Sequence, residues 1–215
     1  MNVVAFTSRK GGSGKSTLAA HLSVYADTPD VPALLIDTDP QGSLAFWHEL
    51  RQAETPVLVQ CEARELEDVI AAAKRDGVQW VFIDTPPHNT QDIAAAMRVA
   101  DLAVIPLRPA VFDIAAVAKT LEMSRALNKP ELPVINSAPP KRGTFEIGVV
   151  TEARQALSDL EVTPWQGQIT QRAGFAHALA SGQAVHEFEP ESPAAKEVQE
   201  LWQAVRRAVE KGNKK

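Results

Sequence analysis

Apolar residues in this chain form short unbroken runs, separated by longer segments in which apolar residues recur every three or four positions. A continuous run of this kind predicts a strand buried on both faces, as in a parallel sheet, rather than a strand with one wet face. We expect strands at residues 3–6, 33–36, 57–59, 80–83, 102–106 and 132–136.

The segments between these runs are predicted to be helices. In residues 63–75, for example, Leu66, Ile70 and Ala73 lie on one face of a helix. The expected helices are 15–26, 43–51, 63–75, 115–127, 144–157, 173–180 and a last helix that contains Val198 and Val209 and has cations near its end, Lys214 and Lys215 among them. Residues 168–172 are predicted to pass from a strand into the helix 173–180. This alternation predicts a doubly wound, mainly parallel α/β fold in a single domain over residues 1–215.

Composition and charge narrow the class of protein. Of the 215 residues, 45% are hydrophobic, which is enough for a sizeable core. The first residues lead directly into a strand and no apolar run approaches the length of a membrane span, so we expect a cytoplasmic protein. The single cysteine, Cys61, excludes a disulfide framework. A net charge of −5 argues against nucleic-acid binding over the whole surface and leaves a local basic patch as the alternative.

A glycine-rich segment with two lysines follows the first predicted strand and reads Lys10-Gly11-Gly12-Ser13-Gly14-Lys15-Ser16-Thr17. Between a buried strand and a helix, such a segment points successive backbone N–H groups at phosphate oxygens. In that arrangement Lys15 reaches the β- and γ-phosphates, the Ser16 hydroxyl holds Mg²⁺, and Thr17 donates to the α-phosphate. The pattern predicts a site for ATP and Mg²⁺, although Arg9 replaces the first glycine of the general motif.

Carboxylates end two of the other predicted strands. Asp37 and Asp39 follow the run 33–36, and Asp84 follows the run 80–83. Ligands of open α/β sheets bind at the carboxyl edge of the strands, so these carboxylates should lie close to the phosphates. There Asp84 is expected to hold Mg²⁺ through water. The segment Asp37-Thr38-Asp39-Pro40 is also typical of a turn with a side-chain cap, and that alternative remains.

The spellings K-G-G-x-G-K-S-T and D-x-D-P-Q-G resemble the motifs of the ParA/MinD family of deviant Walker-type ATPases, and most of all those of short ParA partition ATPases. The resemblance implies that Lys10 reaches across an ATP-sandwich homodimer to the partner's phosphates. It implies that Asp39 orients the hydrolytic water and that Asp37 lies near the magnesium shell. It also supports Asn136 in adenine recognition, where a turn asparagine is the alternative. Residues 106–113 resemble a proline-rich segment near the family's dimer interface.

The resemblance implies the function of a partition or positioning ATPase. ATP closes the homodimer, the dimer binds DNA without sequence preference, and a cargo-bound adaptor that resembles ParB stimulates hydrolysis. Such a cycle moves plasmids, chromosomes or protein assemblies, and the ATP-bound protein would associate with the nucleoid. Nothing precedes the first strand, so the N-terminal DNA-reading extension of longer ParA proteins is not expected. The candidate DNA contacts are Arg172, Arg206, Arg207 and Lys211.

Three other functions remain open. A MinD-like regulator of the division site would need a membrane-binding terminal helix, but residues 205–215 offer only valine and alanine on their apolar side, so no membrane is expected. A metabolic ATP-dependent enzyme of the same superfamily would turn over a small molecule without DNA. A scaffold that binds ATP without hydrolysing it is disfavoured by Asp39.

Overall fold

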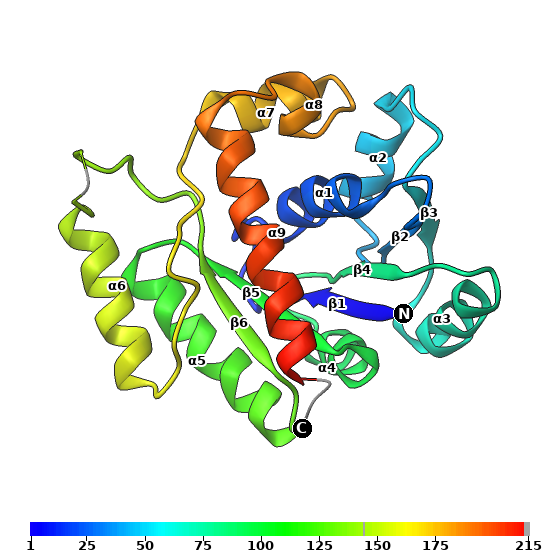
Figure 1. Cartoon of the computed structure of the whole chain (residues 1–215). Helices are drawn as coiled ribbons and strands as arrows, with labels where there is room; N and C mark the ends of the chain where they lie inside the picture. Colours follow the sequence, from blue (N-terminus) through cyan, green and yellow to red (C-terminus); the bar gives the residue numbers. More distant parts are fainter. Residues whose placement is uncertain (144, 213–215) are drawn as a thin grey trace.

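Six strands form one sheet, all parallel, in the order β3-β2-β4-β1-β5-β6 (Figure 1). The computed structural model describes residues 1–143 and 145–212. The strands are β1 (Asn2–Phe6), β2 (Ala33–Asp37), β3 (Val57–Gln60), β4 (Trp80–Asp84), β5 (Leu102–Leu107) and β6 (Glu131–Ile135). Strand β1 lies in the interior of the sheet, between β4 and β5. The glycine-rich segment that follows β1 is therefore flanked by the ends of both neighbouring strands.

Helices cover both faces of the sheet. They are α1 (Lys15–Ala26), α2 (Ser43–Leu50), α3 (Leu66–Arg75) preceded by a 3₁₀ turn η1 (Ala63–Glu65), α4 (Thr90–Val99), α5 (Val111–Ala126), α6 (Gly148–Asp159), α7 (Ala173–Ala180), α8 (Val185–Phe188) and α9 (Pro193–Gly212). Because successive side chains of a strand point to opposite faces, Val4 and Phe6 pack with α1 and α9, whereas Val3 and Ala5 pack with α3 and α4. The two faces thus bury separate apolar layers.

The C-terminal helix α9 crosses the same face as α1 (Figure 1). Its apolar stripe is buried in the core, as the periodicity predicts; the stripe consists of Val198, Leu201, Val205 and Val209. Among residues 1–143 and 145–212, the structure has no helix with the length and apolar character needed to cross a membrane.

The structure confirms the predicted α/β class, and the six strands predicted from apolar runs are each found to within one residue at either end. Helix α4, however, is not among the predicted helices, because the two prolines before it, Pro86 and Pro87, are typical of a loop. It begins at a side-chain cap, in which Asn89 Oδ1 accepts hydrogen bonds from the backbone N–H groups of Gln91 and Asp92, at 3.1 and 3.3 Å. This cap satisfies two N–H groups that the first turn leaves free.

Two helices begin at residues other than those predicted. Helix α5 begins at Val111 rather than at residue 115, and the periodicity missed its first turn because Val111 and Phe112 are 79% and 81% exposed. The predicted helix 144–157 corresponds to α6, which begins at residue 148; Thr144 lies outside the described residues.

Residues 168–172 form no strand and contribute a single parallel bridge, from Thr170 to Ala138. The bridge extends the sheet beside β6 by one pair of residues, and the segment then enters α7 as predicted. Lys214 and Lys215, the predicted cations of the last helix, lie outside the described residues.

Candidate nucleotide-binding site

The glycine-rich loop between β1 and α1 has the conformation that its sequence predicts. Gly12 and Gly14 have φ angles of 71° and 100°, in the left-handed region that favours glycine. A Cβ atom on Gly14 would lie 2.0 Å from Asn136 Nδ2, so no larger residue fits there. Helix α1 begins directly after Gly14 and has no acidic residue in its first turn. Its positive end and the loop together form a cradle for an anion.

Lys15 occupies the first position of α1 with its side chain almost fully buried. Burial lowers the pKa of its ammonium group, and the nearby carboxylates of Asp84 and Asp39 oppose that shift. The ammonium group therefore lies between the loop and the acidic ends of β2 and β4. This is the position expected of a lysine that neutralises phosphate charge.

Asp84 ends β4 and is fully buried. Neither of its carboxylate oxygens has a hydrogen-bond partner of good geometry among the described residues, although the Ser16 hydroxyl lies near enough to oppose the rise in its pKa. Burial raises the pKa of Asp84 to about 7. An isolated buried carboxylate is costly, and a divalent cation or its bound water would satisfy it. Asp84 and Ser16 thus fit the predicted Mg²⁺ site.

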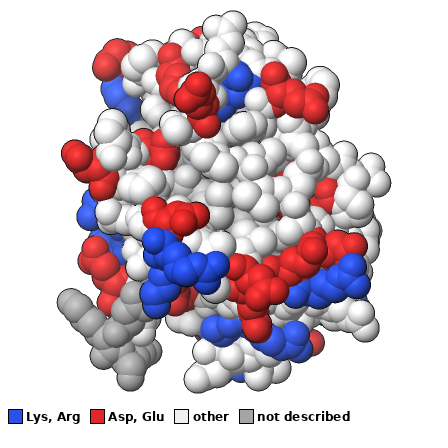
Figure 2. Space-filling model, turned by 90° about the vertical axis from the view of Figure 1, so that its right-hand side faces the viewer, with Lys and Arg blue, Asp and Glu red and all other residues white. Residues whose placement is uncertain are grey.

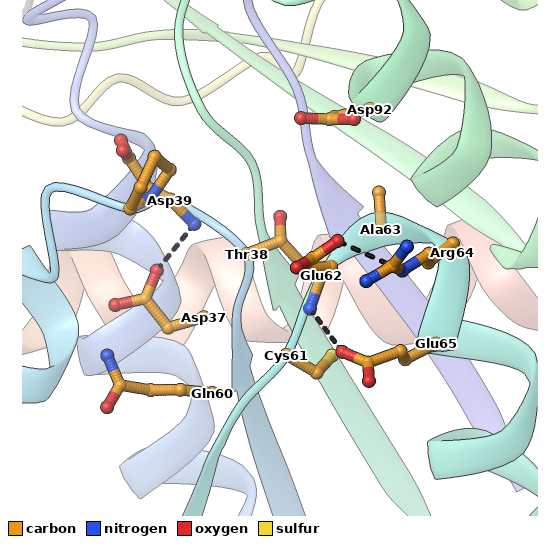
Figure 3. A pocket seen from close by; sticks show the side chains of 11 residues that line it. Asp37, Thr38, Asp39, Gln60, Cys61, Glu62, Ala63, Arg64, Glu65 and Asp92 are labelled. Atoms are coloured by element: carbon orange, nitrogen blue, oxygen red, sulfur yellow. Dashed lines mark hydrogen bonds and ion pairs between the residues drawn. The ribbon is translucent and has the colours of Figure 1, made fainter.

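Asp37 ends β2 and shapes the turn that follows. Its Oδ1 accepts from the backbone N–H of Asp39 at 2.9 Å, the dashed contact in Figure 3, and its Oδ2 accepts from that of Ala45 at 3.3 Å. Burial raises the pKa of Asp37, and these hydrogen bonds oppose the shift. Asp37 therefore joins the turn to α2, so the capped-turn alternative describes its contacts. A place near the magnesium shell stays a prediction.

Asp39 lies at the junction of two cavities. One, of about 430 Å³, also borders Lys15 and Ser16 on the loop. The other, of about 730 Å³, is lined by several acidic side chains, among them Glu62 before η1 and Asp92 of α4, and by Arg64, which is ion-paired with Glu62 (Figure 3). Within the described residues, the one hydrogen bond that Asp39 Oδ1 accepts comes from the backbone N–H of Gln41, at 3.0 Å. Its half-exposed carboxylate can still accept hydrogen bonds from water beside the loop.

Lys10 is ion-paired with Asp113, which lies 103 residues away on the first turn of α5. The Asp113 side chain is 5% exposed and that of Lys10 is 37% exposed. Sequence reasoning did not anticipate this pair. The only available signal was a carboxylate in the first turn of the helix after the proline-rich segment. In the single chain, Lys10 is therefore held by its own α5.

Asn136 follows β6, and its side-chain amide contacts the glycine-rich loop. Its Nδ2 donates to the Ser13 carbonyl at 2.7 Å, and its side chain is buried against Gly14. The amide also borders a third cavity, of about 410 Å³, beside Thr17. Its contact with the loop is structural, and its role toward adenine stays a prediction.

The candidate DNA contacts do not form one patch. Arg172 lies just before α7 and donates to Glu197 at 2.9 Å. Arg206, Arg207 and Lys211 are exposed on α9, and Arg206 is nine residues beyond Glu197, which is about 13 Å along the helix axis. On the side of the molecule where α3 lies, acidic and basic side chains are interspersed rather than gathered by sign (Figure 2).

The chain is similar to known nucleotide-binding proteins. Residues 4–185 match the family model described as the CobQ/CobB/MinD/ParA nucleotide binding domain. The chain is 30% identical over 182 residues to the maintenance of carboxysome distribution protein A of Gloeobacter kilaueensis, covering 83% of this chain and 80% of that protein. It is 24% identical to the chromosome-partitioning ATPase Soj of Thermus thermophilus, covering 96% of each.

Two solved structures have the same fold. An ATP complex of a Cyanothece McdA variant superposes with a TM-score of 0.74 and 18% identity, covering 97% of this chain and 96% of that one. The cell division ATPase MinD of Pyrococcus furiosus superposes with a TM-score of 0.73 and 22% identity, covering 96% and 98%.

Proposed function

The chain belongs to the CobQ/CobB/MinD/ParA family of nucleotide-binding domains, and from that membership we propose that it is an ATPase that positions a cargo through an ATP-dependent homodimer. Nucleotide binding is the property that the family description names. Hydrolysis, dimerisation, DNA binding and an adaptor are the parts proposed for this chain.

The observation that carries the proposal is the buried carboxylate of Asp84 beside Ser16 and Lys15, beneath the glycine loop. Ser16 and Asp84 would hold Mg²⁺, with Asp37 close by, and Lys15 and the loop N–H groups would hold the phosphates. Bound Mg²⁺ supplies positive charge that neutralises the phosphate oxygens. One N–H of the Asn136 amide donates to Ser13, so a contact with adenine would use its second N–H or its Oδ1.

Asp39 is the residue that we propose to orient the attacking water. Its carboxylate borders the same cavity as Lys15 and Ser16, and its oxygens are not consumed by an ion pair among the described residues. An ionised carboxylate at this place can hold a water and accept its proton during hydrolysis. An ATP-binding scaffold without turnover would not require this side chain.

The proposed homodimer depends on the side chain of Lys10. A lysine that binds the phosphates of the partner subunit must extend away from its own subunit. Lys10 can do so because its side chain is partly exposed at the edge of the loop. Closing a dimer would exchange the contact with Asp113 for one with phosphate. Coupling of this kind would make dimerisation depend on ATP.

The cargo is inferred from the names of two relatives. One relative is named for carboxysome distribution and another for chromosome partitioning, so a protein assembly or a chromosome are the cargo classes that we propose, with a ParB-like adaptor as the partner. Nonspecific DNA would serve as the surface on which the dimer is held, through Arg206, Arg207 and Lys211. On this proposal the ATP-bound protein is associated with the nucleoid.

A MinD-like membrane function is the second candidate, since the fold also matches MinD. The apolar stripe of α9 is buried against the sheet, which leaves its described part no apolar face for a membrane. Sedimentation of the Mg·ATP form with DNA and, separately, with anionic vesicles tests the choice. The proposal predicts binding to DNA alone, and binding to vesicles alone would favour the MinD-like function.

A further inference from the structure

A basic side chain that the proposed site does not use lies directly over the glycine loop. Arg108 follows β5, and β5 pairs with β1, so the segment after β5 lies next to the loop after β1. A Cβ atom on Gly12 would lie 3.2 Å from Arg108 Nη2 and 3.9 Å from its Cζ. The guanidinium group therefore contacts the loop at Gly12.

The N–H groups of this guanidinium are available as hydrogen-bond donors to a ligand. The Arg108 side chain makes no hydrogen bond or ion pair within residues 1–143 and 145–212, and it is exposed. Other arginines of the fold are tied to carboxylates, such as Arg51 to Glu187 at 2.8 Å and Arg154 to Glu146 at 2.9 Å. A planar group with free N–H donors beside an anion cradle is suited to phosphate oxygens.

The cavities show on which side of the loop Arg108 lies. Lys15, Ser16 and Asp39 border the 430 Å³ cavity, which is the side of Mg²⁺ and hydrolysis in the proposed site. Arg108 borders the 410 Å³ cavity together with Asn136. The two cavities share Gly12, Gly14 and Thr17 of the loop and the start of α1, together with Leu179 of α7. The terminal phosphate of a bound nucleotide would lie in the 430 Å³ cavity, so Arg108 would face the phosphates nearer the nucleoside.

We infer that Arg108 is a further phosphate-binding residue, which contacts the diphosphate part of a nucleotide held by the loop of its own chain. The inference rests on the proposed function, because it takes this loop as the nucleotide site. It differs from the role proposed for Lys10, which is directed at the phosphates of a partner subunit. Because ATP and ADP share the diphosphate part, Arg108 should contribute equally to the binding of both.

Calorimetric titration with Mg·ADP and with Mg·ATP tests this inference. Arg108→Gln should raise the Kd for each nucleotide by about tenfold, the effect of losing a charge-assisted contact at a partly exposed site. Arg108→Lys keeps the charge and should lose less. Arg98→Gln is the matched control, because Arg98 is an exposed arginine near the end of α4 that borders neither cavity. It should bind both nucleotides as the parent does.

Two results would overturn the inference. Arg108→Gln could bind ADP as tightly as the parent, or it could lose affinity for ATP alone, which would direct Arg108 to the terminal phosphate or to a partner. Equal melting temperatures of parent and variant without nucleotide exclude a folding defect as the cause of weaker binding. A parent that binds neither nucleotide would instead refute the proposed function, so the two failures are distinguishable.

Discussion

The ammonium group of Lys10 is ion-paired with the buried carboxylate of Asp113, across 103 residues of sequence. If Lys10 must break its ion pair with Asp113 to reach the second subunit, that ion pair stabilises the monomer and so opposes dimerisation. Asp113→Asn weakens that hold without leaving a buried charge, because Lys10 is partly exposed.

We therefore predict that Asp113→Asn dimerises at a few-fold lower Mg·ATP concentration than the parent. Light scattering across an ATP titration measures this midpoint. Asp113→Glu keeps the charge and serves as the control. A variant that needs more ATP than the parent would mean that Asp113 helps to place Lys10 in the dimer instead of restraining it.

Asp39→Ala should bind ATP with nearly unchanged affinity and release phosphate about a hundredfold more slowly, because the side chain that orients water is lost while the phosphate contacts remain. Phosphate release, measured with the adaptor or DNA present, checks the rate. Asp92→Asn is the control, since Asp92 lines the same acidic cavity from α4 (Figure 3). Turnover at the parent rate in Asp39→Ala would leave Asp39 as a turn residue only.

Stability should depend on pH through a buried histidine. His21 on α1 accepts the backbone N–H of Val185 at its Nδ1, and burial, reinforced by the nearby His186, lowers the pKa of His21 to about 3. Below pH 6.5 the His21 imidazole is protonated in the unfolded chain but stays neutral in the folded chain, so the free energy of unfolding falls as the pH falls. Between pH 7.5 and 5.5 the loss through His21 amounts to about 1.4 kcal/mol.

Urea denaturation at these two pH values measures the effect. His21→Gln keeps an acceptor for Val185 and should lose about 1.4 kcal/mol less than the parent over the interval. The comparison is made within each protein, so a constant destabilisation by the substitution does not disturb it. The same loss in both proteins would show that His21 is not the group that titrates.

The DNA proposal is tested on α9. The double variant Arg206→Glu and Arg207→Glu should weaken DNA binding in Mg·ATP by at least about tenfold and leave dimerisation intact, since each lost phosphate contact reduces counterion release. Lys74→Glu with Arg75→Glu makes the same change of charge on α3 and should have a small effect. Gel shifts at equal salt compare the two. Unchanged binding by the α9 variant would remove this helix from the DNA surface.

Arg172 is a poorer test of DNA binding than the sequence suggests. Because Arg172 is paired with Glu197, a charge reversal at Arg172 would also place two carboxylates side by side. Weaker DNA binding by that variant would therefore mix two causes.

The sequence predicted the strands well because each is a continuous apolar run, and it predicted the loop and the strand-end carboxylates because their residues are adjacent in the chain. It could not predict contacts between distant segments. The pairs Lys10–Asp113 and Asn136–Ser13 join residues 103 and 123 positions apart, and no local pattern records them. Arg108 is one of 22 basic residues, and only its place over Gly12 distinguishes it. Helix α4 had a readable cap in Asn89, but the prolines before it favoured a loop.

The proposed homodimer is closed by ATP through Lys10. Its most direct test is the molar mass by size-exclusion light scattering with Mg·ATP, in the slowly hydrolysing Asp39→Ala background, with and without Lys10→Ala. We expect a dimer with ATP and a monomer with ADP for Asp39→Ala, and a monomer that still binds ATP when Lys10→Ala is added. A normal ATP-dependent dimer without the Lys10 side chain would contradict it.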